Sequence, residues 1–122
     1  MFINFSNHPS EKWDDKQYDA AKCFGEVTDV PFPNVSPTAD EEEIITLGNK
    51  CASMIMEHAS EGDTVMVQGE FSLSYYVINA LKNKGIRVVS ACSARNVEER
   101  VGDDGKTERK AYFSFVRFRE YV

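Results

Sequence analysis

The sequence lacks the features that would place the protein in a membrane or outside the cell. No apolar run approaches the roughly 20 residues that a helix needs to cross a bilayer. The N-terminus has no basic segment followed by a long apolar one, which a secretory signal would have. The three cysteines, Cys23, Cys51 and Cys92, are widely spaced and form no C-x-x-C pair. We therefore expect free thiols in the cytoplasm and no membrane partner.

Motifs for cofactors and metals are also missing. The sequence contains neither G-x-G-x-x-G nor G-x-x-x-x-G-K-[ST], so it has no dinucleotide fingerprint and no P-loop. It has no G-x-S-x-G elbow, and its two histidines occur in no metal-ligand spacing. We expect no metal and no cofactor.

Positive charge is scarce over most of the chain. The formal net charge is −6, which makes long nucleic acid a poor candidate partner because such binding depends on basic surface. The last part of the chain differs, since residues 95–122 hold seven lysines and arginines. A local basic surface there could hold a small anionic ligand.

The hydrophobic pattern predicts one α/β domain over residues 1–122. Strand and helix signals alternate along residues 1–94, which favours a mostly parallel sheet of about four strands with helices on both faces. An Asp-Gly turn between two apolar and charged runs predicts an antiparallel hairpin over 95–122. Along the second arm of this hairpin, Phe113, Phe115, Arg117 and Arg119 are expected to share one side. The predicted strands are 2–6, 26–30, 64–68 and 86–91, and the predicted helices are 13–24, 40–58 and 71–84.

Three polar segments follow predicted strands, where ligands bind in open parallel sheets. They are Ser6–Pro9, Gly69–Ser72 and Cys92–Arg95. Gly69 would let a ligand approach the backbone, and the next helix would offer free N–H groups to an anion. The alternative for this turn is purely structural, with Ser72 as the helix cap.

His8 and Arg95 are the two side chains in these segments with the clearest chemistry. A histidine in a polar loop could transfer a proton near neutral pH, although it could equally pack against the turn. Arg95 could hold a phosphate with two parallel hydrogen bonds.

Three blocks of the sequence resemble a known group of proteins. The blocks are FINFSNHP, VMVQGEFSLSYYVINAL and DGKTERKAYFSFVRFREY. They are similar to the small accessory proteins of type III CRISPR systems in the Csx series. That group is related to CRISPR-associated Rossmann-like sensor domains and includes stand-alone ring nucleases. The resemblance implies a Rossmann-like three-layer sandwich and a homodimer that binds a cyclic oligoadenylate, with cyclic tetra-adenylate as the expected ring.

The resemblance also implies roles for individual residues. His8 would be the acid or base, with Glu70 as the rival candidate. Arg95 and the backbone amides near Ser72 would hold phosphate. The remaining matched or neighbouring positions would contact ribose, adenine or backbone, and they are Ser6, Asn7, Gly69, Phe71, Tyr75 and Ser93.

Several functions are compatible with this pattern. The protein could cleave the ring without a metal and so end type III CRISPR signalling, or it could only bind and sequester the ring. It could also be a small nucleotide- or sugar-phosphate-binding α/β protein outside CRISPR, or an interaction subunit that docks through its acidic helix.

Overall fold

A five-stranded sheet with three helices forms the mixed α/β fold of residues 1–122, as described by a computed structural model. The strand order is β2-β1-β3-β4-β5; the first four are parallel, and β5 runs antiparallel to β4. The strands are β1 (Phe2–Ser6), β2 (Val27–Pro31), β3 (Thr64–Gln68), β4 (Arg87–Val101) and β5 (Thr107–Glu120). The helices are α1 (Asp15–Lys22), α2 (Glu41–Met56) and α3 (Phe71–Lys82), with a short 3-10 turn, η1 (Ser10–Lys12).

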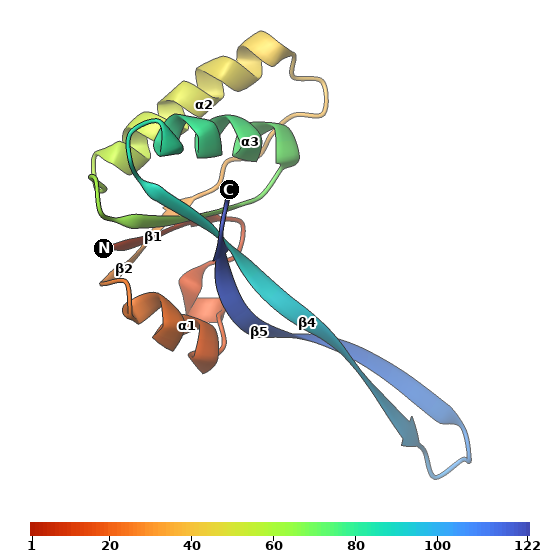
Figure 1. Cartoon of the computed structure of the whole chain (residues 1–122). Helices are drawn as coiled ribbons and strands as arrows, with labels where there is room; N and C mark the ends of the chain where they lie inside the picture. The colour runs from red at the N-terminus through yellow and green to blue at the C-terminus, as the bar shows by residue number, and fades with distance from the viewer.

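Helices lie on both faces of this sheet. Figure 1 shows α2 and α3 together on one face and α1 alone on the other. Ile3 and Phe5 face α2 and α3, whereas Phe2 packs on the α1 side with Phe115 and Phe118. Every residue of β1 is buried, as expected for a central strand covered on both sides. None of the three helices is long and apolar enough to cross a membrane.

Local side-chain and backbone chemistry sets the ends of the helices. Asp40 caps α2, because its carboxylate accepts a hydrogen bond of 2.9 Å from the Glu43 amide. Gly85 follows α3 with a φ of 73°, a left-handed conformation that glycine adopts without strain. The predicted mixed α/β order of elements is therefore confirmed.

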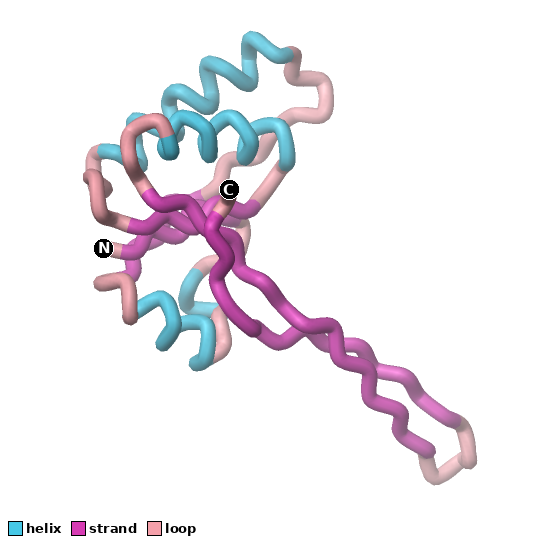
Figure 2. The backbone as a smooth tube through the Cα atoms, in the orientation of Figure 1, coloured by secondary structure: helices cyan, strands magenta, loops and turns pink.

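One boundary prediction is wrong. The strand predicted to end at Ala91 continues to Val101, so Cys92–Arg95 is not a strand-end loop but part of β4. The reason is the partner strand, because β5 pairs with β4 along nearly its whole length and satisfies its backbone groups. Figures 1 and 2 show the resulting long hairpin extending away from the rest of the molecule.

The prediction of which residues share one side of the last strand is also partly wrong. Cys92 pairs with Arg117 and Ser93 pairs with Phe115, so Val116 is an extra residue in a β-bulge. The bulge reverses the alternation, and Phe118 rather than Arg117 lies on the same side as Phe115. Two aromatic rings three residues apart can therefore both enter the core beside α1.

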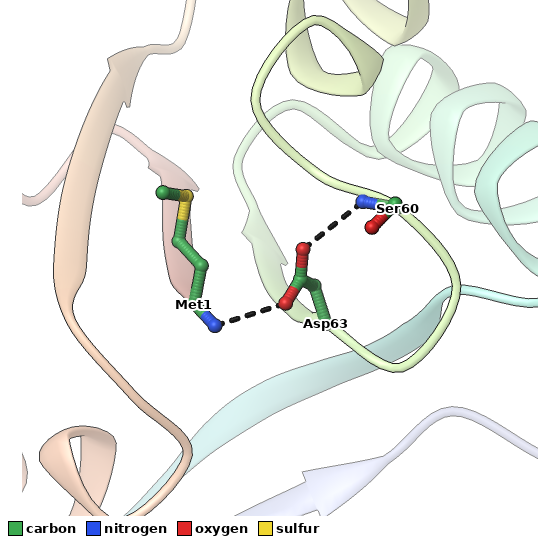
Figure 3. A network of polar contacts seen from close by, with 3 residues as sticks. All are labelled: Met1, Ser60 and Asp63. Carbon is green, nitrogen blue, oxygen red and sulfur yellow. Dashed lines mark hydrogen bonds and ion pairs between the residues drawn. The ribbon is translucent and has the colours of Figure 1, made fainter.

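The edge of the sheet where the parallel strands begin is held by Asp63. Its carboxylate accepts hydrogen bonds from the Met1 ammonium at 2.9 Å and from the Ser60 amide at 3.0 Å, as Figure 3 shows. These contacts, the Ser60 amide first, lower the pKa of Asp63 below its ordinary value of 3.8. The Met1–Asp63 ion pair therefore lies where the parallel strands begin, on the opposite side of the sheet from their carboxyl ends.

Replacing Asp63 with asparagine tests this contact through its pH dependence. A lowered pKa in the folded state stabilises the protein above the ordinary pKa, and the stabilisation is lost as pH falls below it. Asp63→Asn should therefore cost about 1 kcal/mol of unfolding free energy at pH 7. The difference from wild type should shrink as pH falls below 4 in urea titrations. Asp103→Asn, in the exposed hairpin turn, is the control and should differ little from wild type at either pH.

Candidate functional site

A buried hydrogen-bond network shapes the turn that follows β1. Asn4 and Ser6 are 1% and 6% exposed, although both are polar. The Ser6 hydroxyl donates to Asn4 Oδ1 at 2.6 Å and accepts from the His8 amide at 3.1 Å. Asn4 Nδ2 donates to the His8 carbonyl at 2.8 Å. Both backbone groups of His8 are thus bonded to side chains inside the sheet.

Two further residues hold the same turn from outside. The carboxylate of Asp29, in the middle of the neighbouring strand β2, accepts from Asn4 Nδ2 and from the Ser10 amide, each at 3.1 Å. The indole N–H of Trp13 donates to the His8 carbonyl at 3.2 Å. The backbone of His8 is therefore fixed, while its side chain is exposed.

His8 lines a cavity of about 720 Å³ on the α1 side of the sheet. We call this cavity the His8 pocket. Its volume falls in the range of about 300–1,000 Å³ that is usual for small-molecule sites. The pocket joins the start of α1, the end of β3 and the root of the long hairpin. Its lining residues are His8, Lys12, Trp13, Asp14, Gln17, Met66, Gln68, Ala91, Ser93, Phe113 and Phe115.

Some polar groups of the pocket already form hydrogen bonds within the protein. Gln68 Oε1 accepts a hydrogen bond of 2.9 Å from the Ala91 amide, which leaves its Nε2 as a donor for a ligand. Asp14 caps α1 through the Gln17 amide at 2.8 Å. Lys12 is exposed and makes no ion pair, so its ammonium is available to an anion.

Aromatic surface completes the pocket. The ring of Trp13 packs edge-on against Phe2, with their centroids 6.1 Å apart, which fixes one wall. Phe113 is 71% exposed at the root of the hairpin and contributes the opposite part of the lining. One fixed and one exposed aromatic ring provide surfaces on which a planar base could stack.

Glu70 serves a structural purpose at the start of α3. Its two carboxylate oxygens accept from the amides of Ser72 and Leu73 at 2.9 and 2.8 Å. These bonds, the one from Leu73 first, lower the pKa of the carboxyl below its ordinary value. The helix amides that were expected to hold phosphate are therefore already bonded to a carboxylate, and the cap is Glu70 rather than Ser72.

The space beside Gly69 is filled by another side chain of the protein and is not open to a ligand. A Cβ at this position would lie 2.6 Å from ring carbons of Phe32, which itself packs on Phe5 with centroids 4.8 Å apart. The glycine is therefore required for the packing of the loop that follows β2.

The predicted site residues lie at one edge of the sheet but not in one cavity. His8 and Ser93 share the His8 pocket, whereas Ser6 and Asn7 line a smaller hollow of about 300 Å³ beside Asp29. Arg95 is exposed on the hairpin, directly opposite Phe113 in the strand register. A third group, Phe71, Ser72 and Tyr75, lines a groove between the starts of α2 and α3.

Sequence reasoning missed nine of the eleven lining residues of the His8 pocket. Gln68 ends a buried strand and follows three apolar residues, and that polar position was a usable signal. The others depend on the bulge and on the docking of α1, which no local pattern reveals. The missed residues are Lys12, Trp13, Asp14, Gln17, Met66, Gln68, Ala91, Phe113 and Phe115.

Comparison with known proteins gives one match. Residues 1–119 match a family model described as the Uncharacterized protein MJ1673 family. No curated protein and no solved structure matches the chain.

The buried network predicts that replacing Asn4 will strongly lower the stability of the protein. Asn4→Ala removes three hydrogen bonds, because the buried Ser6 hydroxyl loses its acceptor at 2.6 Å and the Asp29 carboxylate and the His8 carbonyl each lose a donor. This loss should cost about 2 kcal/mol in urea unfolding. It should also change the emission of Trp13, the sole tryptophan, because that indole bonds the same carbonyl. Asn34→Ala, at an exposed asparagine, should leave both measurements unchanged. Equal effects of the two substitutions would contradict the role of the network.

The capping contacts predict that Glu70 matters for stability. Glu70→Ala should destabilise the protein by about 1 kcal/mol, as loss of a helix cap does. Glu26→Ala removes an exposed carboxylate that makes no side-chain hydrogen bond and serves as the control. Thermal unfolding at pH 7 measures both, and a stability equal to wild type in Glu70→Ala would refute the cap.

Proposed function

The chain belongs to the Uncharacterized protein MJ1673 family, and we propose that it binds a cyclic oligoadenylate and opens the ring without a metal, which would end type III CRISPR signalling. The observation that carries this proposal is the His8 pocket, where a rigidly held turn presents an exposed histidine beside aromatic, amide and ammonium groups.

The chemistry of the lining suits an adenylate. Trp13 and Phe113 offer aromatic faces to adenine, and the amides of Gln17 and Gln68 offer donors and acceptors to base edges or ribose. Lys12 supplies a positive charge for phosphate, and Arg95, although it does not line the pocket, lies opposite the lining residue Phe113 in the strand register. The resemblance of the block FINFSNHP to ring nucleases points to the same turn.

The cleavage itself needs positioning and proton transfer. A ribose 2′-oxygen attacks the adjacent phosphorus, so that the P–O2′ bond forms while the P–O5′ bond breaks. One new end carries a 2′,3′-cyclic phosphate and the other a 5′-hydroxyl. The 2′-hydroxyl loses its proton and the leaving 5′-oxygen gains one. His8 is the side chain that transfers a proton, and Lys12 stabilises the charge that develops on phosphate.

A second candidate is binding without cleavage. The reaction requires one proton to be removed and another to be delivered. Glu70, the rival candidate for proton transfer, is hydrogen-bonded to amides at the start of α3. A protein with one proton-transferring group could hold the ring and sequester it. A pocket of this kind would also accept a small nucleotide unrelated to CRISPR, so the assays must include one.

The symmetry of the ligand favours two copies of the protein. A ring of four adenylates has two-fold symmetry, and a two-fold dimer would present two equivalent His8 pockets to it. Each copy would then contact half of the ring.

His8→Ala tests the catalytic role. Loss of acid–base catalysis costs about 100-fold or more, so the single-turnover rate of cyclic tetra-adenylate cleavage should fall by that factor. Binding, followed by quenching of Trp13 emission, should change little. His58→Ala is the matched control, because His58 is exposed after the end of α2 and outside the pocket.

The outcomes separate the candidates. A stoichiometric complex with no linear or cyclic-phosphate product in wild type supports sequestration. Thermal stabilisation by AMP but not by cyclic tetra-adenylate supports a nucleotide-binding protein outside CRISPR. At 100 times its dissociation constant, a ligand should stabilise the protein by about 2.7 kcal/mol.

A further inference from the structure

The side chain of Gln68 bridges a gap in the sheet. Strands β3 and β4 are paired from Thr64 to Met66 on the β3 side, and the pairing ends there. Further along, the amide of Ala91 on β4 donates its hydrogen bond to Gln68 Oε1 at 2.9 Å instead of to a backbone carbonyl of β3. Gln68 and Ala91 both line the His8 pocket, so this bridge is part of the site.

The same hydrogen bond fixes which way the amide of Gln68 faces. A free glutamine amide can turn over and exchange its donor for its acceptor, so by itself it does not distinguish one ligand from another. Only Oε1 can accept from the N–H of Ala91, and turning the amide over would place Nε2 there, donor against donor. Nε2 is therefore a fixed donor, and Oε1 keeps its second lone pair as a fixed acceptor.

Burial and charge differ between the two ends of the His8 pocket. Met66 and Phe115 are 1% and 4% exposed, and Gln68 is half-buried on the same face of β3 as Met66. We call these three residues the pocket floor. His8 and Lys12 are exposed, and we call them the pocket rim. Because an unpaired charge is costly to bury, a phosphate belongs at the rim and a base belongs on the floor.

This orientation determines which edge of a purine meets Gln68. The ribose, attached at N9, stays with the phosphate at the rim, so N1 and the group on C6, on the far side of the ring, face the floor. Adenine has an acceptor at N1 and an amino donor on C6. Hypoxanthine and guanine have the reverse, a donor at N1 and an acceptor oxygen on C6.

We propose that Gln68 selects adenine on the pocket floor, with Nε2 donating to adenine N1 and Oε1 accepting from the 6-amino group. Because Ala91 holds the amide in one orientation, hypoxanthine or guanine would meet donor with donor at N1 and acceptor with acceptor at C6. The inference rests on the proposed function for its ligand class, an adenylate, and adds the residue that selects the base. It needs no ring, so a mononucleotide tests it separately from ring binding and cleavage.

The relative affinity for two mononucleotides tests this assignment. AMP and IMP share the same sugar and phosphate and differ only at N1 and C6 of the base. Titrations followed by the emission of Trp13, which lines the pocket, give both dissociation constants. Wild type should bind AMP about tenfold or more tightly than IMP, as expected for a matched pair of hydrogen bonds to a base edge.

Gln68→Glu should abolish this preference. The carboxylate keeps an acceptor for the Ala91 amide but has no donor. AMP would then keep a favourable contact only at its amino group, and IMP would gain one only at N1, so their affinities should become similar. The added charge repels the phosphate of both nucleotides alike and cancels in the ratio.

Gln17→Glu is the matched control, because it places the same charge at the other glutamine of the pocket. Gln17 Nε2 contacts the Met66 sulfur at 4.0 Å, and no backbone amide fixes its orientation. This variant should weaken the binding of both nucleotides and keep the preference for AMP. Thermal unfolding shows that both variants are folded, and the wild-type comparison tests the inference without any variant.

The outcomes separate this inference from the proposed function. Equal affinities for AMP and IMP in wild type, binding of neither, or an AMP preference that is unchanged in Gln68→Glu would overturn the inference. If the preference is present and is lost in Gln68→Glu, but cyclic tetra-adenylate neither binds nor is cleaved, only the proposed function fails. If the ring is cleaved by a wild type that does not distinguish AMP from IMP, only this inference fails.

Discussion

The candidate site depends on two buried polar side chains in a central strand. Asn4 and Ser6 lie where β1 is covered on both faces, so their polar groups must be satisfied inside the protein. They are satisfied by each other, by Asp29 and by the backbone of His8. The requirement that buried polar groups be bonded thereby fixes the course of the turn and places His8, whose side chain is exposed, in the lining of a cavity. The same hydrogen bonds therefore stabilise the strand and fix the geometry of the site.

The start of α3 shows how the same residue types can serve packing instead of binding. A glycine followed by a helix start is a familiar arrangement for holding phosphate, and Gly69–Ser72 matches it in sequence. Here a carboxylate from Glu70 bonds the free amides, and Phe32 fills the space over the glycine. The positive end of the helix is thus neutralised from within, and in the proposed function Lys12 and Arg95 would hold the anion instead.

The bulge between Cys92 and Ser93 links the site to the long hairpin. It lets Phe115 and Phe118 enter the same core beside α1, and beyond it the same face of the hairpin continues outward with Phe113. Phe113 is 71% exposed and lines the pocket, so the hairpin supplies part of the candidate site.

The order of elements could be predicted from the sequence alone, because apolar periodicity, the Asp40 cap and the glycine after α3 act over a few residues. The turn after β1 and His8 within it were predictable for the same reason. The extent of β4, the bulge and the pocket were not, since each depends on which residues meet across strands far apart in the chain. Periodicity determines which faces are buried, but only tertiary contacts decide that the amides of α3 are occupied, that Gln68 and Phe113 line one cavity with His8, and that Arg95 lies on an exposed hairpin.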